Sequence, residues 1–251
     1  MLKMFEVLHG DCLDRLKEIQ TGTVEAVITD PPYGTTESGK DRVTKKGGDV
    51  VKFGQDWDTV VPVAWLKEAF RVLRPGGALM AFCGFEGIHI LKQAAEAEGF
   101  QLRQFFFWCK TNPPPQPRPN FKSGVEQGVF LVRPGPPKWR GGGSALNWMA
   151  HKTAQMEIDG VTRYHPTQKP TAVMRWLIEL VTDPGDLVLD PFAGSGTTGV
   201  ACLQTGRRFT GIERDKTHYQ TAKDRLLHYS QAKTDRGFKG TTPKATQQSL
   251  F

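Results

Sequence analysis

The sequence has no long hydrophobic run. No stretch approaches the ~18 consecutive apolar residues of a membrane-spanning helix, and hydrophobic residues make up only 38% of the 251. Residues 1–6 (MLKMFE) also lack the charged-then-apolar pattern of a secretory signal. These absences argue against a spanning helix, and we expect a cytoplasmic protein that does not enter a membrane.

Cysteine is scarce and widely spaced. The four cysteines, at positions 12, 83, 109 and 202, form no C-x-x-C pair. Zinc sites and disulfide frameworks depend on such pairs or on dense cysteine usage. We therefore expect no metal site and no disulfide scaffold.

Positive charge is concentrated in two places. The chain has 33 Lys and Arg against 26 Asp and Glu, for a net charge of +7. Residues 103–140 hold seven basic side chains and one acidic one, and residues 231–251 hold four and one. Such asymmetry favours a polyanionic partner, and a generally basic surface is the alternative.

Short apolar runs alternate with segments of helical spacing. Strands are predicted at 5–9, 24–29, 78–83, 101–109, 128–132, 187–189 and 208–212, and helices at 11–20, 62–73, 86–98, 169–182, 196–204 and 215–230. This alternation is typical of an α/β protein with a doubly wound, mostly parallel sheet. We expect one domain over 1–230, with a long mobile loop at 34–61 and a flexible basic tail at 231–251.

A glycine-rich turn follows one predicted strand. The segment Asp190-Pro-Phe-Ala-Gly-Ser-Gly-Thr197 joins the run 187–189 to a helix, which places backbone N–H groups beside a ligand. Glu213 ends the next strand, where a carboxylate can accept hydrogen bonds from two ribose hydroxyls. No lysine follows the turn, so ATP is disfavoured. An ordinary strand–turn–helix joint is the alternative.

A second motif, Asp30-Pro31-Pro32-Tyr33, follows another predicted strand. Asp30 can accept a hydrogen bond from an amino group, and the carbonyl of Pro31 can serve as a second acceptor. The ring of Tyr33 offers a face on which a planar base can stack. A purely structural turn is the alternative.

In combination, these residues resemble the amino-group DNA methyltransferases that use S-adenosylmethionine. Asp30–Tyr33 resembles the catalytic motif and Asp190–Gly196 the cofactor motif, and their order is that of the circularly permuted beta subgroup. The resemblance implies a bacterial or phage enzyme. It implies cofactor contacts from Asp11, Cys12, Asp30, His165, Thr167, Lys169, Asp190, Phe192, Ala193, Gly194, Ser195, Gly196, Thr197 and Glu213. For Lys169, ordering of the turn is the alternative role.

The resemblance implies a site-specific enzyme that methylates the exocyclic N6 of a flipped-out adenine. Asp30 stands where the family usually has Asp in adenine enzymes and Ser in N4-cytosine enzymes, and the N4-cytosine activity remains an alternative. Methylation at cytosine C5 is disfavoured because no cysteine follows a proline. A non-catalytic DNA-binding protein with a degenerate site is the alternative from another functional class.

Contacts to double-stranded DNA are expected mainly from the basic middle stretch. The subgroup usually carries target recognition in the segment that corresponds to 133–164, and its members often form homodimers. The predicted DNA contacts are Lys110, Asn112, Arg118, Lys122, Arg133, Lys138 and Arg140.

The final residues resemble the short peptide by which bacterial replication proteins dock on the sliding clamp. That peptide combines a glutamine, a small residue and Leu-Phe, and here Gln247, Leu250 and Phe251 match it. The resemblance predicts a clamp contact through the tail.

Overall fold

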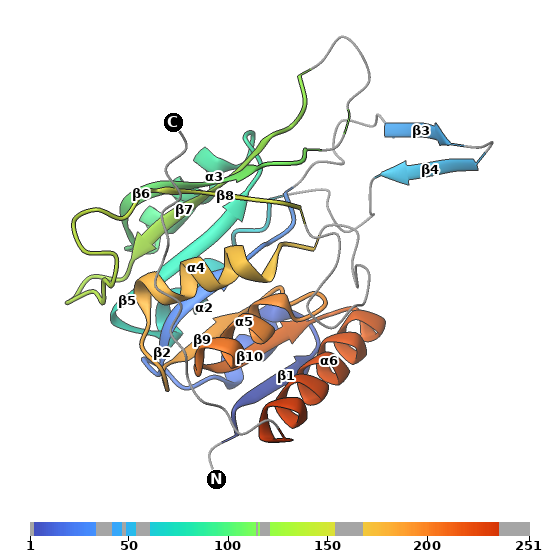
Figure 1. Cartoon of the computed structure of the whole chain (residues 1–251). Helices are drawn as coiled ribbons and strands as arrows, with labels where there is room; N and C mark the ends of the chain where they lie inside the picture. The colour runs from blue at the N-terminus through green and yellow to red at the C-terminus, as the bar shows by residue number, and fades with distance from the viewer. Residues whose placement is uncertain are drawn as a thin grey trace.

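One eight-stranded sheet forms the centre of the computed structural model (Figure 1). The structure describes residues 3–33, 42–46, 49–53, 61–113, 115, 121–153 and 168–235, and only the backbone at 42–46, 49–53 and 232–235. Across the sheet the strands run β1 (Phe5–His9), β10 (Arg208–Glu213), β9 (Leu187–Asp190), β2 (Val24–Thr29), β5 (Leu73–Cys83), β7 (Val125–Val132), β6 (Gln101–Lys110) and β8 (Trp148–His151).

The first five strands in this order are parallel. β7 runs antiparallel to both of its neighbours, and β8 pairs parallel to β6. From β9 the chain continues to β10 on one side, whereas from β2 it continues to β5 on the other. The boundary between β9 and β2 is therefore the topological switch point, where open α/β sheets bind their ligands.

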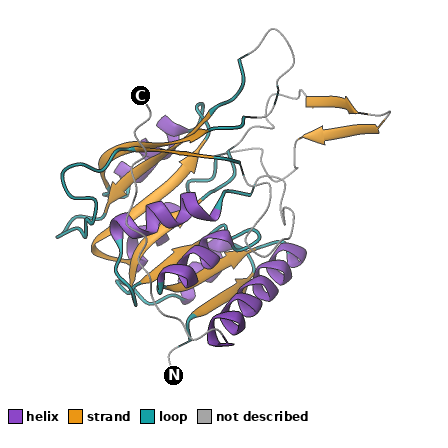
Figure 2. Ribbon diagram, in the orientation of Figure 1, coloured by secondary structure: helices purple, strands orange, loops and turns teal. Residues whose placement is uncertain are grey.

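Helices cover both faces of the sheet (Figure 2). One face carries α4 (Thr171–Val181), α5 (Thr197–Thr205) and α6 (Lys216–Asp235). The other carries α1 (Cys12–Arg15), the 3-10 turn η1 (Leu16–Glu18), α2 (Trp65–Val72) and α3 (Ile88–Ala97). This arrangement confirms the predicted doubly wound, mostly parallel sheet.

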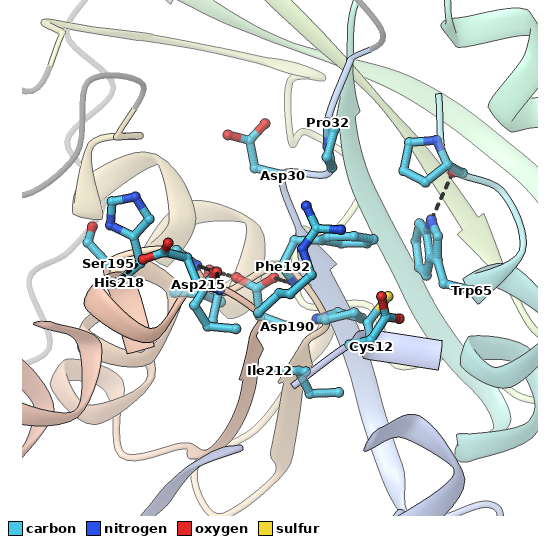
Figure 3. Close-up of a pocket in the computed structure, with 18 of the residues that line it drawn as sticks. Cys12, Asp30, Pro32, Trp65, Asp190, Phe192, Ser195, Ile212, Asp215 and His218 are labelled. Atoms are coloured by element: carbon cyan, nitrogen blue, oxygen red, sulfur yellow. Dashed lines mark hydrogen bonds between the residues drawn. The ribbon is translucent and has the colours of Figure 1, made fainter. Parts of the chain in front are cut away.

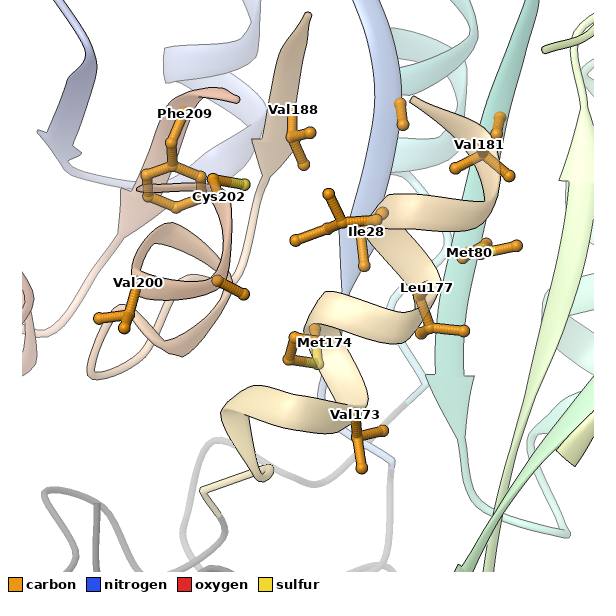
Figure 4. Close-up of a cluster of buried hydrophobic side chains, with 14 of the residues drawn as sticks. Ile28, Met80, Val173, Met174, Leu177, Val181, Val188, Val200, Cys202 and Phe209 are labelled. Atoms are coloured by element: carbon orange, nitrogen blue, oxygen red, sulfur yellow. The ribbon is translucent and has the colours of Figure 1, made fainter. Parts of the chain in front are cut away.

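The burial pattern explains why these segments take these positions. β2 is buried at five of its six residues, as expected for a parallel strand that is covered on both faces. On α4, the buried residues Val173, Met174, Leu177 and Val181 follow helical spacing and pack toward the sheet beside Ile28 (Figure 4). The resulting rigid core holds the ends of β2 and β9 in register.

Two predicted boundaries are wrong. The segment 34–61 was expected to be a loop throughout, yet it contains an antiparallel hairpin of β3 (Arg42–Lys46) and β4 (Asp49–Phe53), which forms a separate two-stranded sheet. Valines at 43, 50 and 51 give these short runs strand propensity. Similarly, α6 continues to Asp235, so the first residues of the predicted tail are helical.

Other differences concern element ends. The helix predicted at 11–20 is only the short α1 followed by η1, and β5 begins directly at the end of α2 where a turn was expected. β8, inside the expected target-recognition segment 133–164, was not predicted and lies at the edge of the main sheet. No helix in the described part of the chain is long and apolar enough to cross a membrane.

Candidate active site

The two sequence motifs meet at the carboxyl edge of neighbouring strands. Asp190 is the last residue of β9, and Asp30 follows the end of β2 directly. Asp30 and Asp190 both line a cavity of about 350 Å³. Figure 3 shows Asp30, Asp190 and Phe192 around this cavity, with Trp65 on the side of α2.

The glycine-rich turn has the backbone geometry that its sequence requires. Gly194 and Gly196 have φ angles of 52° and 82°, in the left-handed region that favours glycine. The N–H of Gly194 donates to Glu213 at 2.9 Å, and the N–H of Asp215 donates to the other oxygen of Glu213 at 2.7 Å. Two strand ends, β9 and β10, are therefore joined through one carboxylate at the cavity wall.

Asp190 anchors the turn from behind. Its side chain is buried and accepts hydrogen bonds from the hydroxyls of Thr29 and Thr198, each at 2.6 Å, and from the N–H of Phe192. Burial raises the pKa of Asp190 to about 6, against the lowering effect of these hydrogen bonds. Because protein donors hold both oxygens, the geometry gives Asp190 an organising role between β2, β9 and α5.

Asp30 belongs to a buried chain of alternating charges. Its Oδ1 accepts a 2.6 Å hydrogen bond from the hydroxyl of Tyr33, and its Oδ2 lies 2.6 Å from Nζ of Lys169. The same ammonium lies 2.9 Å from Oε2 of Glu126, whose Oε1 lies 2.7 Å from Lys110. The chain Lys110–Glu126–Lys169–Asp30 thus runs from β6 and β7 to the end of β2.

The two carboxylates in this chain have different pKa values for a simple reason. Burial raises the pKa of Asp30, the Lys169 ammonium opposes this, and the charge of Glu126 adds to it. For Glu126, the two lysines outweigh burial and lower the pKa to about 2. Burial alone would lower the pKa of Lys169, but its two carboxylate neighbours raise it well above the usual range. Lys169 therefore stays charged.

The position of Tyr33 adds to what the sequence predicted. The ring was expected to stack on a base, whereas here the hydroxyl orients the Asp30 carboxylate and Lys169 lies 5.3 Å from the ring centroid. The ring itself lies close to the backbone of Gly84, where an added Cβ would lie 3.7 Å from two of the ring carbons. The tyrosine hydroxyl is thus a direct part of the site.

Most predicted cofactor residues line the cavity. Pro32 also lines it, whereas Gly196, Pro31 and Tyr33 do not. His165 and Thr167 lie outside the described residues. The predicted residues that line it are Asp11, Cys12, Asp30, Lys169, Asp190, Phe192, Ala193, Gly194, Ser195, Thr197 and Glu213.

Three of the predicted DNA contacts lie at the opposite edge of the sheet, and the structure does not bring them to the cavity. Arg133 donates to main-chain carbonyls where α2 meets β5, and its guanidinium lies over a phenylalanine ring. Lys138 and Arg140 form ion pairs with Asp183 and Asp186, which precede β9. Internal partners hold all three, far from the carboxyl ends of the strands.

The remaining predicted DNA contacts divide in three ways. Lys110 is mostly covered and forms a 2.7 Å ion pair with Glu126. Asn112 accepts from the N–H of Thr153, and Lys122 is exposed before β7 at the edge that carries the cavity. Arg118 lies outside the described residues, as do Gln247, Leu250 and Phe251. The excess charge of 103–140 therefore does not follow one path.

Sequence reasoning missed several residues of the site. Trp65 donates to the carbonyl of Pro62 and packs edge-on against Phe192, with ring centroids 5.6 Å apart. No local pattern marks this contact. Glu126 carried a weak signal, because it is an isolated acid at the start of an apolar strand.

The cavity suits a nucleoside-sized cation. A volume of about 350 Å³ lies in the range of small-molecule sites. A Cβ added at Gly194 would meet no atom within 4 Å, so the turn leaves open space beside it. Lys169 and Arg214 are the basic residues of its lining, and its acidic residues are Asp11, Asp30, Asp190, Glu213 and Asp215. The carboxylates of this lining fit the positive charge of the sulfonium and the ribose hydroxyls of S-adenosylmethionine, because carboxylates attract cations and accept hydrogen bonds.

A cavity with acidic walls at the switch point of a doubly wound sheet, beside the Asp-Pro-Pro-Tyr segment, is the ligand site of an α/β protein of the nucleotide-binding type. The chain belongs to the DNA methylase family of N6 and N4 amino-methyltransferases, whose model matches residues 24–224. Its motif order places it in the beta class, and the family uses S-adenosylmethionine as methyl donor.

Individual relatives agree with this assignment. The Type II methyltransferase M2.DpnII of Streptococcus pneumoniae is 28% identical over 240 residues, and M2.LlaDCHI of Lactococcus lactis subsp. cremoris is 29% identical over 242 residues. Each alignment covers 88% of this chain and 88% of the relative. The crystal structure of the M1.HpyAVI–SAM complex matches with a TM-score of 0.67 and 28% identity, over 89% of this chain and 100% of that one.

Proposed function

We propose that this amino-methyltransferase is site-specific and transfers a methyl group from S-adenosylmethionine to N6 of an adenine flipped out of double-stranded DNA. The observation that carries the proposal is the Asp30 carboxylate at the cavity rim, oriented by Tyr33 and Lys169 at 2.6 Å each. A base inside a duplex cannot reach such a recessed group, so the nucleotide must leave the stack.

Asp30 would act on the amino group of the base. An exocyclic nitrogen is a weak nucleophile because its lone pair is delocalised into the ring. A carboxylate offers about four acceptor positions, and two of those on Asp30 are occupied here. The free positions, with the Pro31 carbonyl, would accept the two amino hydrogens and favour a pyramidal nitrogen with a localised lone pair.

The bound cofactor supplies an electrophilic methyl group on a sulfonium, whose C–S bond breaks as the N–C bond forms, leaving the electron pair on sulfur. The chain's own contribution is orientation, which supplies much of the rate in such a displacement. Asp30 would also take the proton that the methylated nitrogen loses and pass it to solvent. The raised pKa of Asp30 suits it to accept a proton.

Cofactor binding would rest on the walls that the structure brings together. Each oxygen of Glu213 accepts one backbone N–H, and each retains a lone pair for a ribose hydroxyl. Asp11 and Cys12 would lie beside the adenine of the cofactor, as the family resemblance implies. Phe192 and Trp65 provide an apolar wall that excludes water.

The choice of adenine rests on Asp30 as the first residue of the catalytic motif, and N4-cytosine is the second candidate because the family model covers both activities. Mass spectrometry of DNA nucleosides after incubation with labelled cofactor decides between them. We expect the label in N6-methyladenine. Label in N4-methylcytosine would overturn the base assignment, and unlabelled DNA would overturn the proposed enzymatic activity.

Two proposed partners depend on sequence resemblance alone. A sliding clamp would bind the peptide that contains Gln247, Leu250 and Phe251, and a pull-down with and without the last two residues tests this. A homodimer is expected because members of the subgroup often form dimers. The sedimentation of the purified chain in an analytical ultracentrifuge tests this.

A further inference from the structure

Glu126 stands out because it lies at the site without belonging to either motif. It is the second residue of β7, and the antiparallel direction of that strand brings it to the same edge as Asp30. Its side chain is 23% exposed, and both of its oxygens lie within 3 Å of a lysine ammonium. Two cations hold this one carboxylate.

Lys169 is the link between Glu126 and Asp30. Its side chain is 6% exposed and lies between the rings of Tyr33 and Phe82, 5.3 Å and 5.1 Å from their centroids. An ammonium has three N–H donors. Here the ammonium donates to Oδ2 of Asp30 and to Oη of Tyr33 at 3.1 Å, and it lies 2.9 Å from Oε2 of Glu126 as an ion pair. Lys169 is therefore fixed in place from three sides.

The balance between the two carboxylates determines where the ammonium lies. Without the charge of Glu126, Lys169 would have Asp30 as its one anionic neighbour in this cluster, and the ammonium could turn more of its N–H donors onto Asp30. Those donors would occupy lone pairs of Asp30 that a substrate amino group needs. With Glu126 ionised, part of the attraction points away from Asp30.

We propose that Glu126 is a positioning residue for methyl transfer: it holds Lys169 toward β7, so that the Asp30 carboxylate stays oriented yet accessible to the amino group of the substrate. This rests on the proposed role of Asp30 and applies to an adenine or a cytosine substrate alike. Glu126 acts through Lys169 and does not itself touch the reacting atoms.

Two variants should move the pH profile of kcat in opposite directions. The charged or titratable groups around Asp30 are Tyr33, Cys83 of β5, Glu126 of β7, Lys169 and Asp190 of β9. Glu126→Gln removes a like charge near Asp30, and Asp30 becomes the one carboxylate in this cluster that pairs with Lys169. Asp30 therefore ionises more easily. Lys169→Met removes the stabilising cation, so Asp30 ionises less easily.

The experiment measures kcat against pH for the full chain at saturating cofactor and DNA. We expect the acidic limb of the kcat–pH profile to move to lower pH in Glu126→Gln and to higher pH in Lys169→Met. Each shift should be at least about 0.5 pH unit. We also expect Glu126→Gln to lower kcat by between about 10- and 100-fold, with an unchanged Kd for the cofactor. Glu126→Asp, which keeps the charge, should return the limb to its wild-type position.

The matched control is Glu68→Gln, which breaks a 2.7 Å ion pair with Arg71 on α2, away from the site. It should leave the profile in place. A loss of kcat in Glu126→Gln without a shift of the limb would mean a structural role and would overturn the proposal.

If Glu126→Gln does not fold, Glu126→Ala takes its place, because it removes the same charge with a smaller side chain. The acidic limb must again move to lower pH, and an unshifted limb overturns the proposal. Failure of the proposed function looks different, because Asp30→Ala would then retain activity or the wild type would leave DNA unmethylated.

Discussion

The hydroxyl of Thr29 donates a 2.6 Å hydrogen bond to the buried carboxylate of Asp190, across 161 positions of sequence. It joins the strand that carries the catalytic motif to the strand that carries the glycine-rich turn. Because the bond lies at the switch point, the relative position of the two motifs depends on it.

Replacing Thr29 with valine should therefore affect both stability and the cofactor. The change keeps the shape of the side chain and leaves one oxygen of Asp190 short of a donor in a buried place. We expect a loss of about 1–3 kcal/mol of unfolding free energy and weaker cofactor binding. Denaturant unfolding and calorimetry measure these. The matched control, Thr205→Val, removes a hydroxyl that bonds to a helix carbonyl, and equal losses in both variants would contradict the argument.

Asp30→Asn should abolish most activity while leaving the cofactor site intact. The amide keeps the shape but loses the charge and one acceptor oxygen, so it holds the amino hydrogens less well and cannot take the released proton. We expect a fall in kcat of roughly 10²–10⁴-fold, with a cofactor Kd close to wild type. Asp183→Asn, which disrupts an ion pair with Arg140 at the opposite edge, is the control and should remain active.

Two substitutions of Tyr33 separate its hydroxyl from its ring. Tyr33→Phe removes the 2.6 Å bond to Asp30 but keeps the stacking face, and we expect kcat to fall about tenfold, the equivalent of one net hydrogen bond. Tyr33→Ala removes both and should lose more. Tyr229→Phe, whose hydroxyl accepts from Gln204, is the matched control. Equal activity of Tyr33→Phe and wild type would show that the hydroxyl has no role.

The low pKa of Glu126 predicts an acid-dependent part of the stability. Its pKa is about 2 in the fold and 4.5 ordinarily, so the unfolded chain binds a proton more readily as the pH falls. The stability that Glu126 contributes is complete above pH 4.5 and is lost between 4.5 and 2. The loss is on the order of 3 kcal/mol. Denaturant unfolding of wild type and Glu126→Gln over this range measures it, and a constant difference between them would refute it.

The position of Lys122 predicts a salt-dependent contact with DNA. It is exposed at the edge of the sheet that carries the cavity, so Lys122→Ala should weaken binding and reduce the slope of log K against log salt by about 1. Lys138→Ala removes the same charge at the opposite edge, where Asp183 and Asp186 already pair with it. The salt slope of Lys138→Ala should equal that of wild type. A reduced slope in this variant would mean that DNA binds at the edge opposite the cavity and would contradict the prediction.

Local sequence was sufficient for the framework of the site. The apolar runs before Asp30 and before Asp190 predicted two buried strands, and the carboxyl ends of parallel strands lie at one edge. The glycine-rich turn required left-handed backbone at Gly194 and Gly196, and the structure has it there. These features depend on neighbouring residues alone, which is why a pattern predicts them.

The charged chain behind Asp30 could not be predicted in the same way. Glu126 meets Lys169 because β7 runs antiparallel to β5 and places its second residue at the carboxyl edge. The sequence does not encode that direction locally. Similarly, Arg133 is basic in sequence but packs over Phe70 in the fold, because the pairing of β5 and β7 carries it to the opposite edge.

The pairing of β1 with β10 has a consequence for synthesis on the ribosome. β1 is made first, yet its one neighbour in the sheet is residues 208–213. Chains emerge from their N-terminus and fold as they are made, so β1 waits for most of the chain before it can pair. Glu213 and the glycine-rich turn emerge in the same late stage. A nascent chain therefore contains Asp30 long before it contains the glycine-rich turn and Glu213, and the cavity between them is completed only at this late stage.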